Sequence, residues 1–233
     1  LIQQGIEAAI GFLIALVIPR LMGPEIYGKY ALITSVSFLF VLSSRLGFRE
    51  VISRYVPQFR GDSKLEALKQ FFSSLVTIRA LTGLLAAILF FIVARWGFED
   101  FSVPVLVITA GTVLLRGISE LMAMLFLGLN RADRWGAISL IRRSFSFIVV
   151  VLGFWFMGLQ GAMLGWLAVE FLLLILGVIW ARSYLSPFLL GLQIKRMAPF
   201  LRFGLTYFVS NMVLSAFRRS GEVFIQGLTG DYV

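Results

Sequence analysis

The side chains of greatest chemical interest in this sequence are arginines that lie within apolar segments. Arg45 and Arg79 have no acidic residue one turn away on the same expected helix, whereas Arg116 has Glu120 four residues later. Guanidinium groups are permanently charged and bind phosphate through paired hydrogen bonds. Arginines inside apolar segments usually face a bundle interior or a water-filled cavity. We therefore predict that Arg45, Arg79 and Arg116 bind an anionic headgroup, such as a pyrophosphate.

Three glutamates in apolar segments are candidates for a coupling ion. Glu7 and Glu170 stand alone among apolar neighbours, and Glu120 lies one turn from Arg116. Ionisable groups at such positions often belong to ion or proton pathways. Simpler interpretations exist: Arg116 and Glu120 can form a structural pair that neutralises itself, and Glu170 can be protonated or held by one hydrogen bond.

The sequence lacks the residues and motifs of most enzymes. It contains no cysteine and no histidine, so thiolate nucleophiles, disulfides and histidine metal ligands are excluded. It also has no Walker loop and no dinucleotide-binding glycine pattern. We therefore expect no catalytic residue, no metal site and no cofactor.

The composition is that of an integral membrane protein. Of the 233 residues, 59% are hydrophobic and 14% are charged, and the mean hydropathy is +0.93. A soluble domain has about 45–50% apolar and about 25% charged residues. This excludes an ordinary soluble enzyme and a nucleic-acid-binding domain. We predict an all-α polytopic bundle with spans at about 2–19, 29–46, 71–94, 103–128, 137–157, 161–181 and 203–227.

Basic residues predict the orientation of the spans. Thirteen Lys and Arg residues lie in or beside the second, fourth and sixth connections, and three in the first, third and fifth. The positive-inside rule then places the amino terminus in the cytoplasm, in a multi-pass protein of the cytoplasmic (inner) membrane. Arg142 and Arg143 are expected to extend to the cytoplasmic headgroups.

The predicted organisation has three parts. Residues 1–181 form a six-helix lobe, residues 182–202 a cytoplasmic interfacial linker helix, and residues 203–233 the first span of a second lobe. A short repeat supports two lobes: Ile18–Glu25 and Ile225–Asp231 both contain Ile-x-x-Leu-x-Gly followed closely by an acidic residue. Because the sequence begins with Leu1, we expect it to be a fragment.

Motifs at both ends of the chain resemble the polysaccharide flippases of the multidrug/oligosaccharidyl-lipid/polysaccharide exporter superfamily. These motifs are Arg20–Tyr30 (RLMGPEIYGKY), Arg45–Phe48 (RLGF), Leu201–Tyr207 (LRFGLTY) and Gly227–Val233 (GLTGDYV). The resemblance implies about twelve to fourteen helices in two lobes around a cavity. It also implies that a polyprenyl-diphosphate-linked oligosaccharide crosses the membrane by alternating access. Arg45 matches by position a cavity arginine that holds the diphosphate.

This resemblance sets the expected function and its alternatives. We predict a transporter, not an enzyme, whose partners are the lipid-linked oligosaccharide and membrane lipids, without nucleic acid, and which is monomeric when full length. One alternative is a cation-coupled multidrug exporter of the same superfamily. Another is a membrane-embedded glycan polymerase or ligase, which the short outer connections disfavour.

Overall fold

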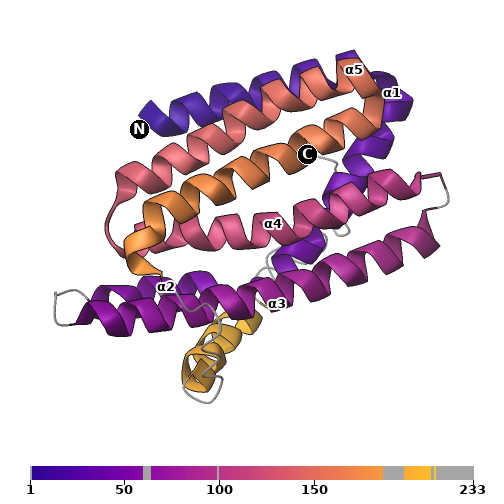
Figure 1. Cartoon of the computed structure of the whole chain (residues 1–233). Helices are drawn as coiled ribbons and strands as arrows, with labels where there is room; N and C mark the ends of the chain where they lie inside the picture. The colour runs from indigo at the N-terminus through magenta and orange to yellow at the C-terminus, as the bar shows by residue number, and fades with distance from the viewer. Residues whose placement is uncertain (1, 60–63, 99, 186–196, 211–212, 214–233) are drawn as a thin grey trace, which may run out of the picture.

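The structure is a computed structural model that describes residues 2–59, 64–98, 100–185, 197–210 and 213. Within these residues every regular element is a helix (Figure 1). The long helices are α1 (Ile2–Ser43), α3 (Leu65–Gly97), α4 (Val103–Gly128) and α5 (Ala132–Ala181). Shorter elements are α2 (Phe48–Tyr55), η1 (Val56–Phe59) and η3 (Arg182–Tyr184), and a further helix covers 197–210.

The helix α1 is broken at Gly23. Its φ of 72° and ψ of 166° lie in a region that only glycine adopts readily. Pro24 follows and cannot donate a backbone hydrogen bond to the preceding turn. The chain therefore changes direction without an intervening loop, and the two halves of α1 point in different directions (Figure 1).

The helix α5 turns back on itself at Met157 and Gly158, where the backbone leaves the helical region. The two halves run side by side (Figure 1) because small residues face each other along the hairpin. A Cβ atom built on Gly153 would collide with the carbonyl group of Gly161, and one on Gly165 would collide with the carbonyl group of Val149. The absence of side chains at these glycines therefore permits direct backbone contact, as in other close membrane helix pairs.

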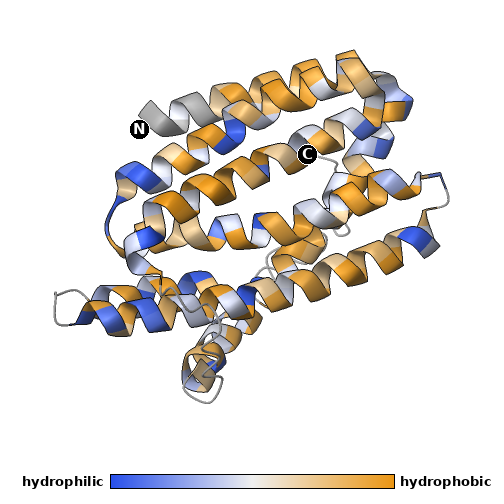
Figure 2. Cartoon of the chain, viewed as in Figure 1, coloured by the Kyte–Doolittle hydropathy of each residue, from blue (hydrophilic) through white to orange (hydrophobic). Residues whose placement is uncertain are grey.

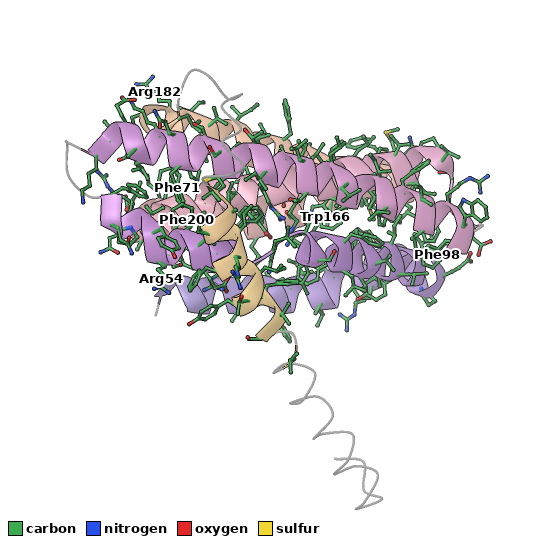
Figure 3. All side chains as sticks on the ribbon, turned by 90° about the horizontal axis from the view of Figure 1, so that it is seen from below. Arg54, Phe71, Phe98, Trp166, Arg182 and Phe200 are labelled. Carbon is green, nitrogen blue, oxygen red and sulfur yellow. The ribbon has the colours of Figure 1, made fainter. Side chains whose placement is uncertain are left out.

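Connections gather at the two ends of the bundle. The breaks in α1 and α5 and the α3–α4 connection lie at one end, and the α2–α3 and α4–α5 connections lie at the other (Figure 1). Phe98 and Arg182 mark these opposite ends in Figure 3. Hydrophilic residues are densest near α2 and the starts of α3 and α5 (Figure 2). These elements therefore form the most polar end of the bundle.

Large apolar side chains cover much of the outer surface. Trp155 is 75% exposed and Phe156 is 80% exposed, although both lie far from the polar end of the bundle. Four of the described helices are long and apolar enough to cross a membrane. These helices therefore present the surface that a lipid bilayer would cover.

The predicted fold class, an all-α membrane helix bundle, is confirmed. The expected span 103–128 coincides with α4. The expected spans 2–19 and 29–46 fall on the two halves of α1, and 137–157 and 161–181 on the two halves of α5. Helix α3 begins at Leu65 instead of about residue 71.

The expected number of spans and the division into lobes stay predictions. Residues 186–196, which make up most of the expected linker, lie outside the described residues, as do most of the expected seventh span and the second copy of the repeat. The described helix 197–210 runs without interruption across the expected boundary at residue 202.

This helix packs across α2 and the start of α3 (Figure 3). The ring of Phe200 lies 4.7 Å from Tyr55 and 5.0 Å from Phe71, centroid to centroid. The guanidinium group of Arg54 stacks on Phe203 at 4.5 Å. Aromatic contacts therefore join the carboxyl-terminal described helix to the polar end of the bundle.

Candidate binding site beside a cationic cleft

Arg45 occupies the turn between α1 and α2. Its amide donates to the carbonyl of Leu42 at 3.1 Å, and its carbonyl accepts from the amide of Phe48 at 2.9 Å. Leu46 and Gly47 then take positive φ values of 43° and 74°. Gly47 also contacts the backbone of Gly204 so closely that a Cβ atom would collide with it. This turn fixes the backbone from which the Arg45 side chain projects.

Arg45 reaches across to Glu120 of α4. Its Nε donates to Oε2 at 3.1 Å and its Nη2 donates to Oε1 at 3.0 Å, which is the forked geometry preferred by guanidinium and carboxylate groups. Arg116 Nε donates to the same Oε1 at 3.4 Å. The side chains of Arg45 and Glu120 are 32% and 9% exposed. The Glu120 carboxylate therefore partly neutralises the charges of both Arg45 and Arg116.

A second carboxylate, Glu170, lies fully buried in the second half of α5. Its Oε2 accepts a 2.6 Å hydrogen bond from Ser119 Oγ, and its Oε1 lies 3.2 Å from Arg142 Nε and 4.0 Å from Arg116 Nε. The expectation that Arg142 extends to the lipid headgroups is wrong for this reason. A buried carboxylate needs a cation beside it, and Arg142 supplies one from the first half of α5.

Arg79 is also buried, at 2% exposed. Its Nε donates to the carbonyl of Gly117 at 3.0 Å, and its Nη1 donates to Ser44 Oγ at 2.9 Å and to the Ser44 carbonyl. It therefore links α3 to α4 and holds the end of α1 immediately before Arg45. A terminal carbonyl of this kind has no partner within its own helix.

A cleft of about 1300 Å³ lies between the second half of α1, α4 and the start of α5, and Phe208 also lines it. Among the described residues its charged lining consists of Arg45, Arg49, Arg142, Glu50 and Glu120, three cations against two anions. Aromatic and aliphatic side chains complete the wall, among them Phe38, Trp135 and Leu39. The cleft therefore offers both excess positive charge and apolar surface.

The structure brings most of the predicted site residues together. Arg45, Arg116, Glu120 and Glu170 form one connected network, and Arg45 and Glu120 line the cleft. Arg79 lies behind this network, and the described lining of the cleft does not include it. Glu7 lies in α1, but its side chain is outside what the structure describes. The substrate-binding and ion-coupling roles of these residues stay predictions.

Sequence reasoning missed Arg142 as a member of the network. Trp135, Ile138, Ser139 and Arg142 all line the cleft, and their spacing of three and four residues places them on one face of α5. The same spacing is visible in the sequence and would have identified this face. Among the described side chains, no group of three or more acidic residues could hold a metal ion.

The bundle, its apolar surface and the charged cleft define a polytopic membrane protein that carries a charged network between its helices. Comparison with family models is consistent with this class: the model of the family described as "Polysaccharide biosynthesis protein" matches residues 1–233. The chain therefore belongs to this family, as the sequence motifs predicted. No curated protein and no solved structure matches it.

Proposed function

We propose that the protein moves a polyprenyl-diphosphate-linked oligosaccharide across the cytoplasmic membrane for polysaccharide biosynthesis. The observation that carries the proposal is the cationic cleft beside Arg45. A diphosphate is an anion with many acceptor oxygens, and arginine is the side chain best suited to bind it. Membership of the polysaccharide biosynthesis family supports the sugar portion of the substrate.

The charges of the network favour an anionic substrate over a cationic drug. Glu120 already accepts hydrogen bonds from Arg45 and Arg116, and Glu170 pairs with Arg142. The described lining of the cleft has three arginines against the two carboxylates Glu50 and Glu120, so it offers an anion more partners than it offers a cationic drug. The alternative of a multidrug exporter therefore has less support from the geometry.

The two ends of the bundle support the proposed orientation. The basic α2–α3 and α4–α5 connections share one end (Figures 1 and 2), and this end faces the cytoplasm under the positive-inside rule. Glu120, the partner of Arg45, lies about two helical turns before the end of α4 on this side. The cleft would therefore first meet the substrate from the inner leaflet, where lipid-linked sugars are assembled. The amino terminus is then cytoplasmic.

Transport by proteoliposomes tests this function. The protein, expressed from its complete gene, is reconstituted with a fluorescent polyprenyl-diphosphate sugar, and the arrival of the lipid in the opposite leaflet is measured by a membrane-impermeant quencher. We expect Arg45→Ala to slow transport by at least about tenfold, because it removes a charge-assisted contact. Arg95→Ala is the matched control, since Arg95 is exposed at the end of α3.

Three outcomes would contradict the proposal. If the Arg45→Ala variant transports the lipid as fast as the unmodified protein, Arg45 does not contribute to transport. Drug sensitivity without a defect in surface glycans, in cells that lack the gene, would favour the multidrug exporter. Sugar-polymer formation by the detergent-solubilised protein would favour a glycan polymerase or ligase.

A further inference from the structure

We infer that Glu120 is a built-in competitor for the diphosphate, and that the substrate opens the α1–α4 contact by displacing this carboxylate from Arg45. The inference rests on the proposed function and adds a role to Glu120, which the sequence had suggested as a coupling-ion site or as a structural partner of Arg116. Three features of the described residues carry it: the geometry of the Arg45 pair, its exposure, and its difference from the Glu170 pair.

The Glu120 carboxylate occupies the donors that a phosphate group would use. Arg45 Nε and Nη2 both point at its two oxygens, at 3.1 and 3.0 Å. Phosphate and carboxylate groups bind the same forked edge of a guanidinium group. A diphosphate that enters the cleft therefore cannot bind this edge of Arg45 until Glu120 leaves it.

The Arg45–Glu120 pair is accessible enough to be exchanged. Both residues line the cleft, and the Arg45 side chain is 32% exposed. A diphosphate offers more charge and more acceptor oxygens than one carboxylate. After displacement, Glu120 retains Arg116, whose Nε lies 3.4 Å away on the same helix, so its charge does not become isolated.

The Glu170 pair has the opposite character. The Glu170 side chain is completely buried, and Ser119 donates to it at 2.6 Å. Breaking this contact would leave an unpaired charge in the interior, which is strongly unfavourable. Of the two carboxylates, Glu120 is therefore the exchangeable one and Glu170 the fixed one.

Displacement also has a mechanical consequence. The Arg45–Glu120 pair joins the turn after α1 to the second half of α4. When a ligand replaces the carboxylate, this cross-link between two walls of the cleft is released. The substrate thereby weakens a contact that holds the two walls together, and movement of α1 relative to α4 becomes coupled to occupancy of the cleft.

Binding of inorganic pyrophosphate to the purified protein, expressed from its complete gene, provides the first test. Because Glu120→Gln removes the competing charge, we expect it to bind pyrophosphate about fivefold to tenfold more tightly, the factor that corresponds to about 1 kcal/mol. Glu50→Gln is the matched control, since Glu50 lines the same cleft. This control measures the general effect of removing one negative charge, and we expect less than about a twofold change.

The results separate the inference from the proposed function. If the unmodified protein binds pyrophosphate and Arg45→Ala abolishes binding, Arg45 belongs to an anion-binding site. Unchanged or weaker binding by Glu120→Gln would then overturn the inference alone, as would an equal gain from Glu50→Gln. If neither the unmodified protein nor Glu120→Gln binds pyrophosphate, both the anion site and the inference are overturned.

A second measurement does not depend on the folding of the Glu120 variant. The sequence contains no cysteine, so Ser43→Cys at the end of α1 and Arg131→Cys, at an exposed position between α4 and α5, can carry a pair of spin labels. In the protein with Glu120 intact, saturating pyrophosphate should shift the distance distribution between the labels. A distribution that does not change while pyrophosphate is bound would overturn the inference.

Discussion

The buried Arg142–Glu170 pair gives a sharp prediction about stability. Glu170→Gln keeps the shape of the side chain and a hydrogen-bond partner for Ser119 but leaves Arg142 without its counter-charge. At the observed 3.2 Å, Coulomb's law with an effective dielectric constant of about 20 gives about 5 kcal/mol. Water reaches the Arg142 side chain, which is 19% exposed, and desolvation of the pair offsets part of the attraction. We therefore expect a loss of about 2–3 kcal/mol.

The assay is reversible unfolding of the protein in mixed micelles on addition of sodium dodecyl sulfate, followed by the fluorescence of its five tryptophans. Glu66→Gln is the matched control. Glu66 forms a shorter contact with Lys69, at 2.6 Å, but its side chain is 76% exposed. Water screens such a pair, so we expect this control to lose less than about 0.5 kcal/mol.

A double-mutant cycle completes the test. Replacing both charges, as Glu170→Gln with Arg142→Met, leaves no unpaired charge of this pair in the interior. The double variant should therefore lose less stability than the sum of the two single losses, by about 2 kcal/mol. Additive losses, or a Glu170→Gln loss no larger than that of Glu66→Gln, would refute the reasoning that burial makes this pair strong.

The remaining predictions concern glycines and use the same unfolding assay. Gly23→Ala should lower the free energy of unfolding by about 1–3 kcal/mol, because alanine is strained at the positive φ of this residue. Gly28→Ala, with open space around the new methyl group, should be neutral or stabilise α1 by up to about 1 kcal/mol. Equal effects of the two substitutions would contradict a break of α1 at Gly23. Gly153→Leu should cost about 3 kcal/mol or prevent folding, because the side chain would push against Gly161. Gly97→Leu has no neighbour to displace and should change stability little; a similar loss there would count against the hairpin contact.

The backbone could be predicted from the sequence in considerable detail. The apolar stretch from Ser144 to Val169 is too long for one straight crossing, and Gly158 lies within it, which is why the turn in α5 was expected there. Gly23 followed by Pro24 predicted the end of the first span within α1 in the same way. Both breaks follow from local chemistry, because glycine and proline change the backbone wherever they occur.

The partners of the charged residues were much harder to predict. Arg45 and Glu120 are 75 positions apart, and Arg142 and Glu170 lie on opposite halves of a hairpin. In soluble proteins a polar outer face shows which side of a helix is buried. Here lipid and protein interior are both apolar, so the sequence does not show which faces meet. Arg142 was therefore assigned to the lipid headgroups although it points at Glu170.

The hairpin of α5 also has a consequence for how the chain enters the bilayer. Between Arg143 and Glu170 the sequence carries no charged side chain, and its reversal occupies only Met157 and Gly158. The tip of this hairpin can therefore cross the hydrocarbon core without carrying a charged side chain or a hydrated loop with it. Because the backbones of Gly153 and Gly161 are in direct contact, the two arms of this uncharged segment can enter the bilayer together as one hairpin.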